Sequence, residues 1–441
     1  MSSFTAQEPP NPDEALFEDL KIPANYRKYD ETTETEIIMH LEEWKRTAYG
    51  VLCKLRDDLR ALRFISAPCQ AEIVYYTSPF DADGPWVLDS SREVARDILT
   101  TYATPAADLQ ERVLRNFVKP IFQRNPHPSV NVETGRKLPR AAGGPLGHLD
   151  YMEGQEWKNH PGVSSVMSWC LSHADTSTVE KLWHLFVPPI MTLLDDYEAK
   201  YKLRGVQLVS QLLEASPPDL LRRTGIDSLI LNSLKTCMAF LQHRETPNLI
   251  RATVPTSVRL TELTTAEGSA ARFDQLCALL GDDIIGNIWI YASNDPDALQ
   301  ASVDAIPTVV KALGVGTSRY LKGLIPQLVF PLIPAPDNGA SIGSKLSSLE
   351  ALCVVIKACA PRIHKWQGTI LEAILKCWVD LPDSNVEPEE QARLSDRCRS
   401  VCTLLARVCE PTVHKDYQRI LSLDPALFGP LLQLPQIETS A

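Results

Sequence analysis

Apolar side chains recur at steps of three and four residues along most of the chain, the spacing of one face of an α-helix. The run Leu394–Cys409 is the clearest case, because its arginines and its aspartate fall on the face opposite the apolar positions. In the run Leu346–Ala360, leucine, isoleucine and cysteine side chains form one stripe in the same way. The pattern predicts amphipathic helices that each bury one face.

Such helices are predicted along most of the chain. Two lie at 35–65 and 91–122, and Pro105 interrupts the second. The others are predicted at 166–171, 179–194, 197–213, 226–241, 273–291, 299–313, 320–333, 346–359, 370–381 and 394–408. No pair of alternating runs is joined by Asn-Gly or Asp-Gly, the usual signature of a β-hairpin. The predicted fold class is therefore all-α.

The segment 185–216 has the layout of a HEAT repeat, with prolines inside a first helix, aspartates at its end and a basic second helix. The residues that carry this layout are Pro188, Pro189, Asp195, Asp196, Lys202 and Gly205. We expect the turn aspartates to accept N–H bonds from the next helix start and the lysine to pair with an aspartate across the stack. Weaker copies recur at roughly the 40–47 residue spacing of HEAT and armadillo repeats. Residues 151–435 are therefore predicted to form a HEAT-like helical-repeat solenoid.

Differences in composition divide the chain outside the predicted repeats into four segments. Residues 1–15 are acidic and proline-rich and predict a disordered tail, followed by an N-terminal helical region at 16–122. Residues 123–150 lack periodicity and predict a Pro/Gly-rich basic loop or linker, and 436–441 predict a C-terminal tail. The loop carries the compact basic cluster Arg124, Arg136, Lys137 and Arg140. For that cluster a solvated loop is favoured over a phosphate contact.

The composition narrows the class of protein. The formal net charge is −11, which repels phosphate backbones and predicts no nucleic-acid partner. The first residues have no basic and apolar segments of a signal peptide, and the longest apolar stretches are too short to span a bilayer. Without a signal, the eleven cysteines are expected to be thiols in a reducing compartment. We expect a soluble intracellular protein with no membrane partner.

Candidate chemical motifs are weak. Gly339-Ala-Ser341-Ile-Gly343 matches a hydrolase nucleophile elbow, but that elbow needs a preceding strand, and a proline-rich helix exit precedes it here. Cys398, Cys402 and Cys409 share a helix face and are expected in the core, because no C-x-x-C motif accompanies them. The carboxylate pair at the HEAT turn is explained without catalysis. The sequence predicts no catalytic residue, no metal site and no cofactor.

Three segments, 156–173, 182–214 and 219–241, resemble the family of the second Tel-two-interacting protein, in a fungal version. The phrase PPxxxLLDDxxxxxKxxG at 188–205 is the most specific part, and the resemblance covers roughly residues 150–410. That family supplies the smallest subunit of the TTT (Triple T) co-chaperone complex.

The resemblance implies a non-enzymatic α-solenoid that binds larger helical-repeat subunits of that complex. With the ninety-kilodalton heat-shock chaperone, it would support maturation of phosphatidylinositol-3-kinase-like kinases of the TOR and ATM/ATR types. It also implies cytoplasmic and nuclear location and roles in telomere and DNA-damage signalling. The alternative is a generic importin- or armadillo-like adaptor that binds peptide cargo.

The second half of the solenoid, about 270–430, is predicted to dock onto the partner. Tryptophans at groove edges serve as anchors in interfaces, and an uncapped end of a helical stack exposes apolar surface. The predicted partner-binding residues are Trp289, Trp366, Trp378, Leu431, Leu432 and Leu434.

Overall fold

The structure is a computed structural model that describes residues 14–62, 64–143, 151–334, 340–382, 387–410 and 412–432. Within these ranges the chain is helical, and β-pairing is limited to one isolated antiparallel bridge between Val130 and Lys137. The all-α prediction is confirmed. The chain forms two compact units, residues 1–230 and 231–441.

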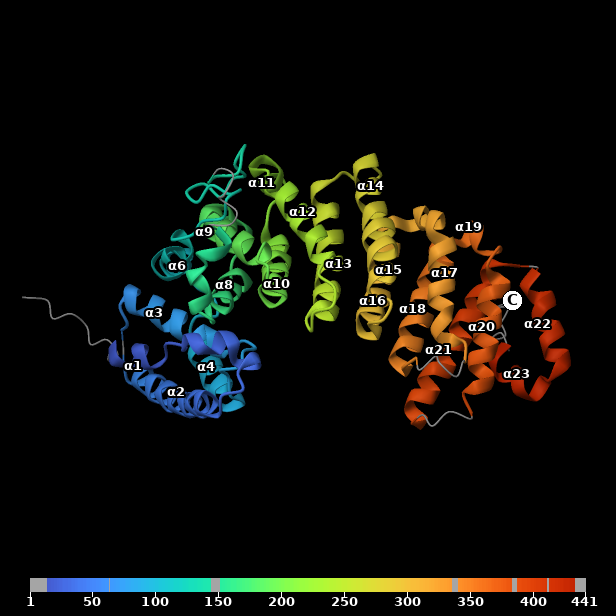
Figure 1. The fold of residues 1–441 in the computed structure, drawn as a ribbon, viewed down its shortest axis with the longest axis horizontal. Coiled ribbons are helices and arrows are strands. Elements are labelled where there is room, and N and C mark those ends of the chain that lie inside the picture. Colours follow the sequence, from blue (N-terminus) through green and yellow to red (C-terminus); the bar gives the residue numbers. More distant parts are fainter. Residues whose placement is uncertain are drawn as a thin grey trace, which may run out of the picture. The chain divides into compact units, whose positions relative to one another are not determined.

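The first unit begins with α1 (Glu14–Asp19), whose Leu16 and Phe17 are buried. In Figure 1, α2 runs along one edge of this unit, beside α1 and α4. Its helices are α1, η1 (Ala24–Glu31), α2 (Thr35–Ala61), α3 (Ala67–Thr77), η2 (Ser78–Phe80), α4 (Asp89–Thr100), α5 (Ala107–Val113), η3 (Leu114–Val118), α6 (Lys119–Gln123), η5 (Glu156–Asn159), α8 (Val163–Ser172), α9 (Thr176–Leu194), α10 (Ala199–Ala215), α11 (Pro218–Thr224) and the start of α12 (Ile226–Met238). Capping marks several starts: Asp175 accepts a hydrogen bond from the Thr178 N–H at the start of α9.

The predicted loop at 123–150 packs into the first unit over its described part. The Trp183 indole donates to the Gly135 carbonyl at 2.9 Å, and the Lys137 N–H donates to the Thr224 carbonyl at 2.9 Å. Gly135 has φ of +64°, a conformation that favours glycine. Residues 144–150 lie outside the described residues. The two compact units divide near residue 230.

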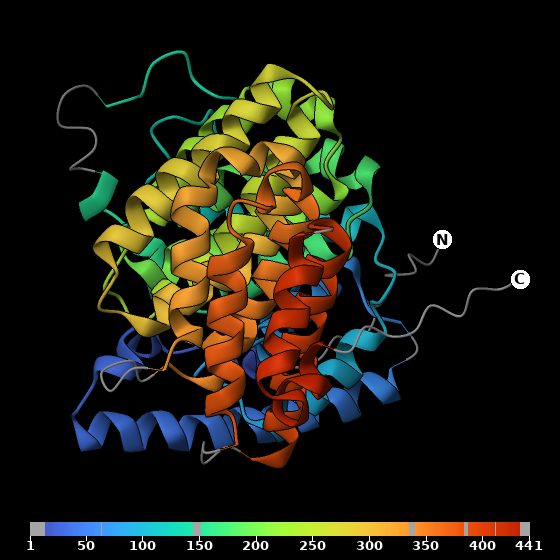
Figure 2. The ribbon, with the colours of Figure 1, turned by 90° about the vertical axis from the view of Figure 1, so that its right-hand side faces the viewer.

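The second unit is a stack of helices in two layers (Figures 1 and 2). Helices α13, α16, α18 and α21 pack in that order as the first layer, and α14–η6–α15, α17, α20 and α22 form the second. Its helices are α13 (Thr246–Thr264), α14 (Ala270–Ala278), η6 (Leu279–Ile288), α15 (Trp289–Tyr291), α16 (Pro296–Leu313), η7 (Gly314–Tyr320), α17 (Leu321–Val329), η8 (Phe330–Leu332), α18 (Ile342–Ala358), α19 (Ala360–Ile363), α20 (Gln367–Asp380), α21 (Pro388–Val408), α22 (Thr412–Leu423) and α23 (Pro425–Leu432). Each helix packs on its neighbours along the chain, as in a HEAT-like solenoid.

Among the described residues, one helical run, Pro296–Leu332, could cross a membrane by its length and composition alone. The apolar stretches of the sequence predict no segment long enough to span a bilayer, so a run of this length was not expected. Half of its most apolar window is buried, and α16 within it packs between α13 and α18 in the core of the second unit. The run therefore has the position of a core helix.

Candidate functional site: a buried ion network and an apolar groove

The α9–α10 turn is the predicted HEAT turn. Pro188 and Pro189 lie inside α9 and are buried. Asp195 follows the last residue of α9 and accepts a hydrogen bond from His127 Nε2 at 2.9 Å. Asp196 accepts from the Glu198 backbone N–H at 2.8 Å, just before α10 begins. This is the backbone contact expected of a turn aspartate.

Lys202 and Gly205 tie α10 to the end of α9. The Lys202 ammonium donates to the Leu194 carbonyl at 2.8 Å, a contact with a helix C-terminus, and its pairing with an aspartate across the stack stays a prediction. A Cβ on Gly205 would lie 2.4 Å from the backbone N and Cα of Leu194, far inside van der Waals distance. Glycine at this position lets the two helices approach each other closely.

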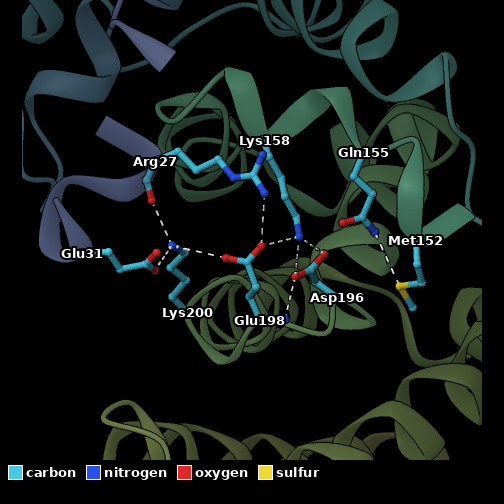
Figure 3. A network of polar contacts seen from close by, with 8 residues as sticks. All are labelled: Arg27, Glu31, Met152, Gln155, Lys158, Asp196, Glu198 and Lys200. Carbon is cyan, nitrogen blue, oxygen red and sulfur yellow. Dashed lines mark hydrogen bonds and ion pairs between the residues drawn. The ribbon is translucent and has the colours of Figure 1, made fainter. Parts of the chain in front are cut away.

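Lys158 is the cation that pairs with the turn aspartate (Figure 3). Its ammonium lies 2.9 Å from Asp196 Oδ2 and 2.7 Å from Glu198 Oε1. The side chains of Lys158 and Asp196 are 1% and 0% exposed. A charge this deeply buried persists only when it is paired and hydrogen-bonded, as it is here.

Glu198 extends the network toward the N-terminal part of the first unit (Figure 3). Lys200 lies 3.3 Å from Glu198 Oε2, and its ammonium also donates to the Arg27 carbonyl at 2.9 Å. The Arg27 guanidinium lies 3.5 Å from Glu198 Oε1, and Glu31 accepts from Lys200 at 3.4 Å. The network thus joins η1 to the α9–α10 turn, although about 170 residues separate them.

Aromatic rings enclose the Lys158 ammonium. It lies 3.9 Å from the centre of the Tyr197 ring, 5.0 Å from that of Tyr201 and 5.5 Å from that of Trp157. These rings supply cation–π attraction where water is excluded. Sequence reasoning missed Lys158. The sequence signal that could have indicated this pairing is Trp157-Lys158, some forty residues before the acidic, tyrosine-containing turn at Asp196 and Tyr197.

The two carboxyl groups differ in their electrostatics. Burial raises the pKa of Asp196, against the lowering by Lys158 and the Glu198 N–H. Burial would also raise the pKa of Glu198, but Lys158 and Lys200 together hold that pKa below its usual value. Because both carboxyl groups and the ammonium are committed to one another, the arrangement is suited to holding segments together rather than to proton transfer.

The Gly-x-Ser-x-Gly pattern and the basic cluster are the remaining motifs, and their side chains make structural contacts. Ser341 caps α18 by accepting a hydrogen bond from the Ser344 N–H at 3.1 Å. No strand precedes it in the described residues, and Gly339 lies outside them. In the basic cluster, Arg124 pairs with Glu156, and the Lys137 ammonium donates to Ser228 at 3.0 Å.

The cysteines on α21 and at its C-terminal end are buried, as their stripe predicts. Cys398, Cys402 and Cys409 are 0%, 1% and 4% exposed. Burial raises the pKa of the Cys402 thiol to about 12, so it stays protonated at neutral pH. Across the described ranges, no group of three or more metal-binding side chains gathers.

The predicted partner-binding residues lie in the second unit. Trp289, Trp366 and Trp378 are partly buried against its core. The Trp289 indole donates to Ser302 at 2.8 Å, and the Trp378 indole donates to the Leu427 carbonyl at 3.0 Å. These hydrogen bonds fix the two rings in the fold, and whether any of the tryptophans binds a partner stays a prediction.

The expected apolar end of the stack is not found where the sequence placed it. Leu431 and Leu432 are 2% and 4% exposed, because α23 packs against α21 and α22. Leu434 lies outside the described residues. The terminal helix α23 thus covers its own leucines.

An apolar groove lies on the second unit between α20 and α22. Its volume is about 360 Å³. It is lined by Gly368, Leu371, Glu372, Leu375, Lys376, Asp416, Arg419 and Ile420. No sequence pattern predicted this groove. It forms between α20 and α22, which are separated along the chain by α21, a helix of the other layer.

The chain belongs to the Tti2 family, whose model matches residues 71–338. The match covers parts of both compact units and includes the α9–α10 turn.

Curated relatives agree with this family. The chain is 24% identical over 245 residues to the TELO2-interacting protein 2 of Rattus norvegicus, covering 55% of this chain and 47% of the relative. It is 24% identical over 310 residues to the TELO2-interacting protein 2 of Homo sapiens, covering 69% and 56%. The chain thus spans about half the length of the curated relatives it matches.

Solved structures with similar helical arrangements include Kap121p bound to Pho4p, with a TM-score of 0.47 and 14% identity, covering 94% of this chain and 37% of that one. The SYS-1/POP-1 complex gives a TM-score of 0.42 with 9% identity, covering 95% and 73%. At these scores the similarities say nothing of what this chain binds.

Proposed function

We propose that this Tti2-family chain is a non-catalytic subunit of the TTT complex that docks onto larger helical-repeat subunits. The match to the family over residues 71–338 carries the proposal. The relatives are named for interaction with TELO2, and this chain would share that partner or its complex. The buried Lys158 network supports a scaffold role, because its charged groups are committed to holding the first unit together.

The wider role follows from the same assignment. As part of the complex, the chain would support the maturation and stability of phosphatidylinositol-3-kinase-like kinases together with heat-shock chaperones, in the cytoplasm and nucleus. The contribution of this subunit would be an interface rather than a reaction. The second unit is the proposed docking half, because it combines the α20–α22 groove with exposed apolar side chains such as Val379 and Leu423.

The test is purification of the tagged chain from its own cells, with identification of stoichiometric partners. We expect a homologue of TELO2 and a second large helical-repeat protein at stoichiometric amounts after size-exclusion chromatography. Recovery of diverse peptide-bearing cargo instead, without a stable large partner, would support the adaptor alternative. Deletion of residues 411–441 is a poor probe of docking, because it removes α22, whose Tyr417 hydroxyl donates to the Cys402 carbonyl within the core.

A further inference from the structure

Exposed apolar side chains extend the α20–α22 groove beyond the residues that line it. Val379 follows Leu375 one turn later on α20, and Leu423 follows Ile420 about one turn later on α22. These two side chains are 46% and 77% exposed. The apolar stripe therefore runs from Gly368 to Val379, a length of about 16 Å at 1.5 Å per helical residue.

Both rims of the groove carry charges in the same order. On α20, Glu372 comes before Lys376, with which it forms an exposed ion pair at 2.7 Å, and on α22, Asp416, which accepts from the Gln367 amide at 3.4 Å, comes before Arg419. Each rim thus has an acid followed by a base along the helix direction. A ligand with complementary charges presents a base near the first end of the groove and an acid near the second.

A single helix can satisfy that order without strain. A helix is stabilised by acids near its N-terminus and bases near its C-terminus. Such a helix meets the rim charges when it runs antiparallel to α20 and α22. Antiparallel packing is also how consecutive helices of the second unit stack.

We infer that the α20–α22 groove receives one amphipathic helix from a larger subunit of the complex. The helix is about three turns long, has an apolar stripe against Leu371, Leu375 and Ile420, and carries an acid before a base on its flanks. It lies antiparallel to α20, so its N-terminal turn contacts Val379 and Leu423. This assignment rests on the proposed docking of the second unit and adds its location and chemistry.

Gly368 offers a direct test, because a Cβ at this exposed helical position would meet no atom within 4 Å. Gly368→Leu fills the groove without a clash in the free chain. The measurement is the amount of the co-expressed TELO2 homologue and second large subunit that co-purifies, with a dissociation constant from interferometry. We expect at least about a tenfold loss of affinity, because the added side chain occupies the place of one anchor of the docked helix, with an unchanged or higher melting temperature.

Gly50→Leu on α2 is the matched control, because Gly50 is also an exposed helical glycine with no atom within 4 Å of an added Cβ. It should retain wild-type affinity. Leu423→Asp is a second test that does not depend on Gly368, and it should also weaken binding.

The wild-type chain separates the two hypotheses. If it fails to co-purify with the large subunits, the proposed function is wrong. If it co-purifies and both Gly368→Leu and Leu423→Asp bind as tightly as wild type, the groove is not the docking site. Equal losses in Gly50→Leu would likewise remove the assignment.

Discussion

At the scale of single residues, Lys158 joins η5 to the α9–α10 turn through two ion pairs, to Asp196 and Glu198. Replacing it by methionine keeps much of the volume but leaves Asp196 buried without its cation. Breaking a buried pair in this way typically costs about 3–5 kcal/mol. We expect Lys158→Met to lower the free energy of unfolding of the first unit by that order, measured by chemical denaturation.

The control for that change is Lys181→Met. Lys181 also lies between two acids, Asp108 and Glu111, but its side chain is 51% exposed. Exposed ion pairs contribute about 0–1 kcal/mol, so the control should unfold almost as wild type does. If both variants lost a similar amount of unfolding free energy, burial of the Lys158 network would not be what stabilises the first unit.

Asp283 provides a pH-dependent prediction in the second unit. Burial raises its pKa from 3.8 to about 6, with Lys235 opposing and Asp282 adding to the shift. Since the folded-state pKa is raised, the cost of the charged form is present above that pKa and disappears as the pH falls through it. Asp283→Asn should therefore melt higher than wild type at about pH 7, and the difference should shrink toward about pH 5. A difference that grows on acidification would contradict this, and the measurement is calorimetry at both pH values.

Residue-level prediction worked where periodicity alone decides burial. The stripe containing Cys398 and Cys402 placed both thiols in the core correctly, because one helix face must be buried. Lys158 could not be found that way, since its partners lie about forty residues away across a turn. Leu431 and Leu432 were expected to lie at an exposed end of the stack. Their burial could not be predicted, because the packing of α23 on α21 is a tertiary contact without a local sequence signal.

At the scale of elements, the contact between α9 and α10 depends on Gly205. An added Cβ would lie 2.4 Å from Leu194 backbone atoms, which cannot move aside as a side-chain tip can. Overpacking of this kind typically costs about 1–3 kcal/mol. We expect Gly205→Ala to destabilise the first unit by that order in urea titrations. Gly50→Ala, an exposed helical position, should instead stabilise by up to about 1 kcal/mol, and destabilisation by both would point to a general intolerance of change.

Element prediction was good for long periodic helices, whereas the packing of the segment after α6 was not predicted. The pattern at 394–408 corresponds closely to α21 (Pro388–Val408), and 299–313 to α16 (Pro296–Leu313). The described part of 123–150 was expected to be a loop or linker, and it is held by Trp183 and Thr224 from other helices. Hydrogen bonds that join distant segments leave no periodic signal, so its packing could not be predicted.

At the scale of the whole molecule, the division into two compact units predicts that the substitutions above act independently of one another. Lys158 and Gly205 act within residues 1–230, whereas Asp283 acts within 231–441. Stability is not uniform across a protein, and local opening follows cooperative units. Hydrogen exchange with mass spectrometry should therefore show faster exchange in α8, α9 and α10 for Lys158→Met, with α16, α18 and α21 unchanged. Asp283→Asn should alter protection only around η6 and α16. If Lys158→Met accelerated exchange equally in α16, α18 and α21, the chain would unfold as one cooperative body and the division near residue 230 would have no energetic meaning.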